Sequence, residues 1–191
     1  DGWDILFVIK HIVAIGISSS TDPRVIEHLA EDLFAEDNEF KTILAFNIPK
    51  SRAFMHLDTV FTQIDYGMFT IHPGIEKELT VFEITKHKNG IYVHKVVDSL
   101  EKVLEKHLKM PIKLIRCGGI DKITSIREQW NDAANTLAIA PGKVIVYDRN
   151  HVTNNMLRKA GVTVLEIESS ELSRGRGGPR CMSMPLEREE I

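Results

Sequence analysis

The sequence predicts an α/β protein built from one unit, strand–strand–helix–strand, which occurs three times along 191 residues. Short β-branched apolar runs alternate with segments whose apolar residues recur at helical spacing, and turn-forming residues lie between them. Repeats of this kind bury their apolar faces against neighbouring repeats. We therefore expect the three units to be part of a larger closed assembly.

The first unit is predicted from two apolar runs, residues 5–9 and 12–17, which are rich in β-branched residues and are typical of paired strands. A helix is expected to begin at Thr21-Asp22-Pro23, because Thr or Asp can cap it and proline fits its first turn. Its apolar positions form one stripe: Val25, Ile26, Leu29, Leu33 and Phe34. Residues 42–46 are expected to form the closing strand.

The second unit contains a hairpin-like insertion at about residues 79–97. Asn89-Gly90 between the apolar runs 79–86 and 91–97 is the strongest short hairpin signal. The rest of this unit is predicted to have strands at 59–64, 68–71 and 112–115 and a helix at 99–108.

The third unit is predicted from strands at 136–140 and 144–147 around the turn Pro141-Gly142, followed by a helix at 150–160 that Gly161 ends. Residues 162–167 are expected to be its closing strand.

Composition excludes some function classes. With 24 basic and 27 acidic residues the formal net charge is −3, so we expect no nucleic-acid partner and no anionic membrane surface. The most apolar stretch, residues 5–17, is interrupted by Lys10 and His11 and is too short to cross a bilayer. No signal peptide is visible. Cys117 and Cys181 form neither a disulfide framework nor a zinc motif, which favours the cytoplasm.

Cys181 is the first candidate for chemistry. It follows Ser173-Arg174-Gly175-Arg176-Gly177-Gly178-Pro179-Arg180, a glycine-rich loop with three arginines. Neighbouring cations stabilise a thiolate, so we expect a lowered pKa and a nucleophilic cysteine. The alternative is a mobile basic surface loop that ends in a buried structural cysteine.

His56 and Asp58 are the second candidates. In an extended segment with Leu57 facing the core, both side chains would point to the opposite face. A carboxylate beside an imidazole raises the histidine pKa and suits it to proton transfer. The alternative is a surface pair at a strand end. The pair can serve Cys181 only if the fold brings the three together.

Four segments closely resemble the bacterial arginine deiminases: residues 170–185, 55–61, 127–132 and 147–150. The resemblance runs along the whole chain and covers about the C-terminal half of a family member. It implies a pseudo-fivefold αβ propeller, the pentein fold, with about three of its five units present. Residues 1–191 would then be the C-terminal portion of one catalytic domain.

The resemblance also implies a reaction, hydrolysis of L-arginine to L-citrulline and ammonia, without metal or organic cofactor. By matching motifs, Cys181 would attack the guanidinium carbon and form a covalent amidino intermediate, while His56 would protonate the departing ammonia and then activate water. Asp58 would hold the guanidinium by charge-assisted hydrogen bonds. Arg176 would bind substrate or gate the site. Asp1 aligns with a family glutamate that helps to bind the guanidinium.

The chain departs from the family pattern at Trp3, where the family has glycine, and at Ser20, where it has an arginine for the substrate carboxylate. Two other functions therefore remain open: deimination of a different guanidino compound, or a catalytically inactive propeller fragment that acts by binding. The joint presence of Cys181, His56 and Asp58 favours an enzyme. We expect L-arginine as the small-molecule partner and a homo-oligomeric assembly.

Overall fold

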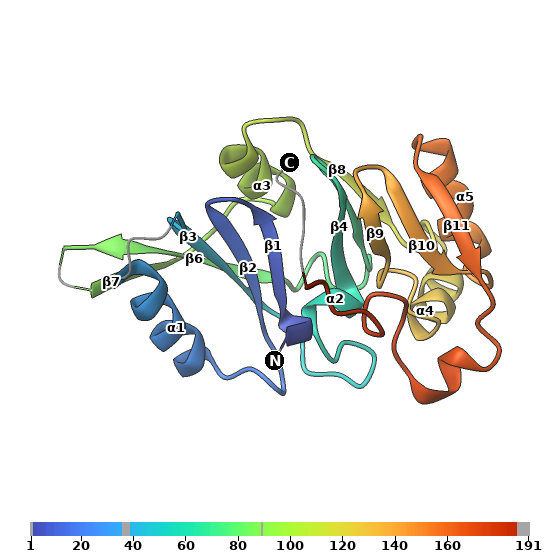
Figure 1. The fold of residues 1–191 in the computed structure, drawn as a ribbon, viewed down its shortest axis with the longest axis horizontal. Coiled ribbons are helices and arrows are strands. Elements are labelled where there is room, and N and C mark those ends of the chain that lie inside the picture. The colour runs from blue at the N-terminus through green and yellow to red at the C-terminus, as the bar shows by residue number, and fades with distance from the viewer. Residues whose placement is uncertain (1, 36–38, 89, 187–191) are drawn as a thin grey trace.

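Three small sheets, each with a helix packed against it, lie side by side in the structure (Figure 1). It is a computed structural model, and it describes residues 2–35, 39–88 and 90–186. The strand–strand–helix–strand unit occurs three times, as the sequence predicts.

The first unit consists of β1 (Ile5–Ile9), β2 (Ile12–Ile17), α1 (Pro23–Ala35) and β3 (Thr42–Asn47). β1 pairs antiparallel with β2, and β2 pairs parallel with β3, so α1 is the crossover helix that joins two parallel strands. Four residues of the predicted stripe of α1 (Ile26, Leu29, Leu33 and Phe34) pack against the buried faces of β2 and β3, whereas Val25 is exposed. The shared cluster also includes Val13, Ile15, Ala30 and Ile43.

The second unit repeats this order with β4 (Phe61–Asp65), β5 (Met68–Ile71), α3 (Leu100–Leu108) and β8 (Lys113–Arg116). β5 pairs antiparallel with β4 and parallel with β8. The inner side of α3 joins the largest apolar cluster of the described chain through Leu100, Val103, Leu104 and Leu108.

A hairpin of β6 (Thr80–His87) and β7 (Gly90–Lys95) separates β5 from α3 in the chain. β6 pairs antiparallel with β3 of the first unit, which makes a five-stranded sheet in the order β1-β2-β3-β6-β7. Asn89 of the predicted turn lies outside the described residues, whereas Gly90 has a φ of 132°, which glycine adopts readily.

The third unit consists of β9 (Leu137–Ala140), β10 (Lys143–Tyr147), α5 (His151–Lys159) and β11 (Thr163–Ile167). It has the same antiparallel and parallel pairings as the other two units. Short 3₁₀ helices, η1 (Gly2–Asp4) and η2 (Leu172–Gly175), lie near the two ends of the described chain.

Helix α4 (Lys122–Trp130), which joins the second and third units, was not predicted from the sequence. Its polarity is inverted: Ile123, Ile126 and Trp130 are exposed, while Ser125, Glu128 and Gln129 are buried. Glu128 is buried because it accepts hydrogen bonds from the backbone N–H groups of Val152 and Thr153 at the start of α5, at 2.9 and 3.0 Å. A pattern of apolar burial therefore could not reveal this helix.

The extended segment predicted around Leu57 is wrong. Residues 57–60 form a single helical turn, α2 (Leu57–Val60), and the strand begins at Phe61 rather than at Thr59. Two side chains fix this turn. Asp4 Oδ1 accepts the Leu57 N–H at 2.9 Å, and the Thr59 hydroxyl donates to the His56 carbonyl at 2.7 Å.

The first strands of the three units, β1, β4 and β9, lie next to one another, with β4 in the middle (Figure 1). The segments that precede them are therefore brought together at one end: η1 before β1, α2 before β4 and the loop at 131–136 before β9. Among the described helices, none is both long and apolar enough to cross a membrane.

Candidate active site

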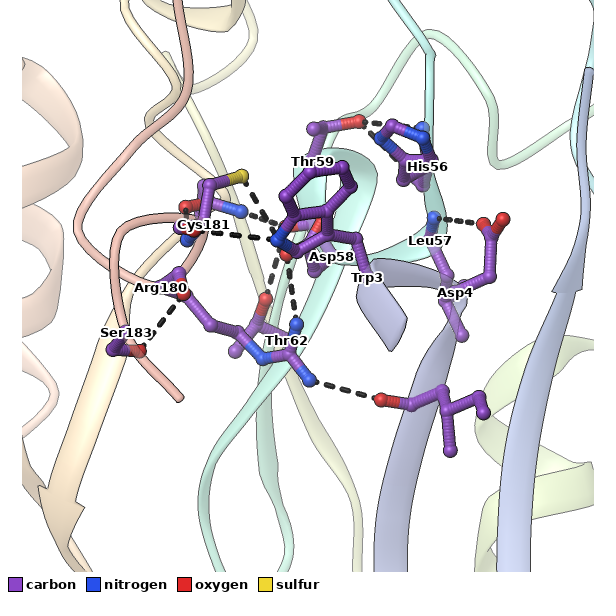
Figure 2. Close-up of polar contacts among 12 residues, drawn as sticks. Trp3, Asp4, His56, Leu57, Asp58, Thr59, Thr62, Arg180, Cys181 and Ser183 are labelled. Carbon is purple, nitrogen blue, oxygen red and sulfur yellow. Dashed lines mark hydrogen bonds and ion pairs between the residues drawn. The ribbon is translucent and has the colours of Figure 1, made fainter. Parts of the chain in front are cut away.

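The candidate residues gather where these three segments meet the loop that follows η2. Figure 2 shows Cys181, Arg180 and Asp58 grouped together, with the Trp3 ring between this group and His56 in the view drawn. Each unit thus contributes a segment from the same position, directly before its first strand.

Asp58 is almost completely buried, with 2% of its surface exposed. Its Oδ2 atom accepts a hydrogen bond from Arg180 Nη1 at 2.7 Å, and Cys181 Sγ lies 3.6 Å from the same oxygen. Oδ1 is buried and has no hydrogen-bond partner among the described residues. Burial raises the pKa of the Asp58 carboxyl, and the Arg180 guanidinium opposes that shift.

Cys181 is held through both ends of its backbone. Its N–H donates to Asn135 Oδ1 at 3.0 Å, and its carbonyl accepts from Trp3 Nε1 at 3.2 Å. Burial raises the pKa of the thiol to about 12, and the negative charge of Asp58 adds to the increase. In the protein without substrate the sulfur is therefore a protonated thiol at neutral pH.

The expectation that three arginines lower this pKa is wrong. The guanidinium groups are engaged elsewhere: Arg174 pairs with Glu171 at 3.2 Å, Arg176 lies 4.6 Å over the Trp130 ring, and Arg180 pairs with Asp58. Each guanidinium is thus engaged with another group, and burial and the Asp58 carboxylate dominate the pKa of the sulfur.

His56 precedes α2 as its N-cap and is 7% exposed. Its ring centroid lies 5.1 Å from that of Trp3, and its Nε2 lies 3.4 Å from Ser20 Oγ. The helical turn directs Asp58 towards Arg180 and Cys181, while the imidazole contacts Trp3 and Ser20. The two residues therefore do not share the face of a strand as the sequence analysis expected.

A pocket of about 230 Å³ is shared by His56 and Cys181, whereas Asp58 lies beside Cys181 and is not among the lining residues. His56 and Cys181 both line it, as do Trp3, Met55, Trp130, Asp132, Arg52, Arg176 and Met182. A slightly larger cavity of about 270 Å³ lies between β7 and α3, and its lining includes Glu83 and several lysines but no described cysteine. The smaller pocket is therefore the candidate site.

Asp132 and Arg176 form part of the wall of this pocket, and both have a positive φ, 56° and 64°, which is uncommon for residues other than glycine. Burial raises the pKa of Asp132 to about 6, and the charge of Arg176 opposes the shift. Arg176 Nη2 also donates to the Arg52 carbonyl at 3.4 Å. Arg176 thus lies at the pocket, whereas Asp1 lies outside the described residues, so its role stays a prediction.

Several residues that hold the site were not found from the sequence. Asp4 is fully buried and accepts hydrogen bonds from Ser18 and Thr21 at 2.7 Å as well as from Leu57. Gln129 Nε2 donates to the Thr59 carbonyl at 2.9 Å. Gln129 and Asp132 belong to one of the segments that carry the family resemblance, which was the available signal. Within the described ranges, no cluster of three or more His, Cys, Asp or Glu side chains could hold a metal ion.

Comparison with known proteins gives consistent matches. A family model described as arginine deiminase matches residues 1–188. The chain is 56% identical over 195 residues to the arginine deiminase of Clostridium perfringens (strain SM101 / Type A), covering all of this chain and 47% of that protein. It is 56% identical over 197 residues to the arginine deiminase of Treponema denticola, covering all of this chain and 48% of that protein. The chain spans about half the length of these curated relatives.

Two solved structures have the same fold. An inosamine-phosphate amidinotransferase from Streptomyces griseus matches with a TM-score of 0.66 at 16% identity, over all of this chain and 47% of the other. The amidinotransferase SxtG from Microseira wollei matches with a TM-score of 0.65 at 15% identity, over 100% and 48%. The predicted fold class is confirmed: an α/β pentein fold, of which three units are present.

Proposed function

The chain belongs to the arginine deiminase family, and on that premise we propose that the protein containing it hydrolyses L-arginine to L-citrulline and ammonia through a covalent intermediate on Cys181. One observation carries the proposal. Asp58 Oδ1 is a buried carboxylate oxygen without a hydrogen-bond partner among the described residues, on a carboxylate 3.6 Å from the Cys181 sulfur. Such an oxygen lacks a hydrogen-bond donor, and a cationic donor suits a carboxylate best.

The guanidinium group of arginine fits this requirement. It is planar and cationic, and its N–H groups donate to carboxylates with strict geometry. Arg180 occupies Oδ2 of Asp58 and favours the ionised carboxylate, so Oδ1 stays available to the substrate. Asp132, on the pocket wall, supplies a second carboxylate that is ionised above about pH 6.

Substrate binding also supplies what the free thiol lacks. The Cys181 pKa is high because the site is buried and because Asp58 is negative. A bound guanidinium neutralises Asp58 and places a positive charge beside the sulfur, and both effects favour the thiolate. The nucleophile is thus activated only when its substrate is present.

The chemistry then proceeds in two halves. The thiol proton passes to His56, Sγ forms a bond to the guanidinium carbon, and His56 returns the proton to the amine that leaves as ammonia. This leaves a cationic amidino group on the sulfur. Water then adds to the same carbon and gives a proton to His56. The carbon–sulfur bond breaks, releasing citrulline, and the sulfur is reprotonated as the free thiol.

Replacement of the nucleophile tests this function. Cys181→Ala should abolish citrulline formation and leave the circular dichroism spectrum unchanged. Cys117→Ala is the matched control, because Cys117 is fully buried with a pKa raised to about 12 and does not line the pocket. Acid-quenched wild type should carry arginine less ammonia on Cys181. Turnover by Cys181→Ala would refute the assignment.

A second candidate, deimination of a guanidino compound without a carboxylate, is favoured by Ser20 and by the apolar pocket residues Trp3, Met55 and Trp130. Ser20→Arg should lower KM for arginine more than for decarboxylated arginine if a carboxylate contact is missing. Equal effects on both substrates would show that Ser20 does not mark a missing contact with the substrate carboxylate. A protein that acts by binding alone would give identical results for wild type and Cys181→Ala in every functional assay.

We further propose that residues 1–191 form the C-terminal portion of one catalytic domain, with residues 79–97 as an insertion. A homo-oligomeric assembly and a cytoplasmic location stay predictions, which size-exclusion chromatography with light scattering and cell fractionation would test.

A further inference from the structure

Asn135 connects the two halves of the candidate site without lining its pocket. It lies in the loop between α4 and β9, and its side chain is completely buried. Asn135 Nδ2 donates to the Asp58 carbonyl at 3.0 Å, and Asn135 Oδ1 accepts from the Cys181 N–H at 3.0 Å. One side chain thus joins two segments that are 77 and 46 residues away from it.

We propose that Asn135 is a positioning residue that fixes the Cys181 sulfur relative to the Asp58 carboxylate for attack on a bound guanidinium. The inference rests on the proposed function, since it assigns Asn135 a part in that reaction. Both hydrogen bonds of the Asn135 side chain are with backbone atoms, and the pocket-lining residues do not include it.

The chemistry of the two contacts accounts for the residue type. The Cys181 N–H can only donate and the Asp58 carbonyl can only accept, so the orientation of the amide is determined by its partners. Aspartate at position 135 would place an oxygen, which accepts and does not donate, next to the Asp58 carbonyl, which also only accepts. Serine is too short to reach both groups.

The glycines of the loop fit this arrangement. A Cβ atom on Gly178 would lie 2.6 Å from Asn135 Oδ1 and 2.7 Å from Asn135 Cβ, which is too close for any other residue. Gly177 has a φ of 96°, and a Cβ there would lie 3.0 Å from Cys181 Cβ. These two glycines therefore allow the loop to pack against Asn135 and place the cysteine.

The contact also affects charge at the site. The Asn135 amide is one of the groups that lower the pKa of the Asp58 carboxyl. Loss of the Asn135 amide would make the position of Cys181 less fixed and would also make the ionised form of the Asp58 carboxyl less favourable. Arg180 would still pair with Asp58 and favour its ionised form, so guanidinium binding would persist and kcat should fall while KM changes little.

The experiment compares Asn135→Ser and Asn135→Asp with Asn150→Ser, in the natural protein with all of its chain. Asn150 is a control for the loss of a buried amide: it is 1% exposed, donates to the Asn131 carbonyl at 2.9 Å, and makes no side-chain hydrogen bond to the Asp58 or Cys181 segment. We expect both Asn135 variants to lower kcat by about 10- to 100-fold with KM within about twofold, and Asn150→Ser to lower kcat much less, because it does not hold Cys181 or Asp58.

Alkylation of Cys181 by iodoacetamide between pH 7 and 10 separates positioning from a general loss of structure. Asn135→Ser should free the loop, lower the thiol pKa towards its ordinary value and speed alkylation about threefold at pH 8. Asn135→Asp should slow it, because a carboxylate is added beside the sulfur. Cys117 should stay unlabelled in folded protein, so its labelling identifies any variant that unfolds.

Unchanged alkylation profiles in both Asn135 variants, or an equal shift in Asn150→Ser, would overturn the proposal. Alkylation requires no turnover. Profiles shifted as expected in a protein that does not hydrolyse arginine would therefore refute the proposed function and leave the placement of Cys181 by Asn135 intact.

Discussion

Replacing Asp58 with asparagine should make the Cys181 thiol more reactive towards an alkylating agent while removing turnover. Asp58 Oδ2 lies 3.6 Å from Cys181 Sγ, and its negative charge is one cause of the raised thiol pKa. Asparagine has nearly the same shape but no charge. The substitution therefore tests the electrostatic effect of Asp58 on the sulfur.

The size of the effect follows from the separation. At 3.6 Å and an effective dielectric constant of about 20, a unit charge on Asp58 would raise the free energy of the thiolate by about 4.6 kcal/mol. Arg180 offsets part of that charge and the pocket admits water, so we take half, about 2.3 kcal/mol or about 1.7 pKa units. The thiolate fraction at pH 8 then rises about 50-fold, its intrinsic nucleophilicity falls about sixfold, and alkylation should be about eightfold faster.

The assay is the rate of iodoacetamide labelling at pH 8, with the labelled cysteine identified by peptide mapping. Protein labelled at Cys117 is excluded as unfolded, since that residue is fully buried. An unchanged or slower rate at Cys181 in Asp58→Asn would refute the reasoning. It would also remove the argument that a bound guanidinium activates the thiol by neutralising Asp58.

Three other substitutions have defined outcomes. The pKa of Asp132 is raised to about 6 in the folded protein, so the protonated carboxyl stabilises the fold below pH 4 and this stabilisation is lost as pH rises through 6. In urea titrations, Asp132→Asn should therefore raise the free energy of unfolding by about 3 kcal/mol at pH 8 and leave it unchanged at pH 4. Tyr147→Phe removes the hydroxyl that donates to the Gly177 carbonyl at 2.9 Å, so the free energy of unfolding should fall by about 1 kcal/mol. Limited proteolysis should also cut the loop that contains Gly177 faster than in wild type. Equal proteolysis rates would contradict this prediction. In Glu128→Gln, a neutral amide replaces the buried carboxylate that accepts from the Thr153 N–H and hydroxyl. The free energy of unfolding in urea should therefore fall by about 2 kcal/mol. A loss below about 0.5 kcal/mol would show that the negative charge of Glu128 does not contribute to stability.

The strands could be predicted because each is an apolar, β-branched run, so the signal is local. The two helical segments that were missed depend on distant partners. α4 buries Glu128 and Gln129 because their hydrogen bonds are with α5 and with the segment at 53–59. α2 depends on Asp4, which is 53 residues from Leu57.

The same division holds for the site. The family motifs predict Cys181, His56 and Asp58 as site residues. In the structure, Cys181 and His56 line one pocket and Asp58 lies beside Cys181. The direction of the Cys181 pKa could not be obtained from its arginine neighbours, because what matters is which group each guanidinium contacts. That is a tertiary property, and neither Asn135 nor Trp3 could be connected with the cysteine from their positions in the chain.

The placement of the site has a consequence for the order of folding. Contacts within each unit are short in sequence, whereas the Trp3–Cys181 and Arg180–Asp58 contacts close loops of 178 and 122 residues. Closing long loops costs chain entropy, so such contacts form late. We therefore expect the sheets and their helices to assemble first, while Cys181 is still in water and the pKa of its thiol is near the ordinary value. Oxidative damage at this cysteine should be concentrated in the interval between synthesis and the final docking of the loop.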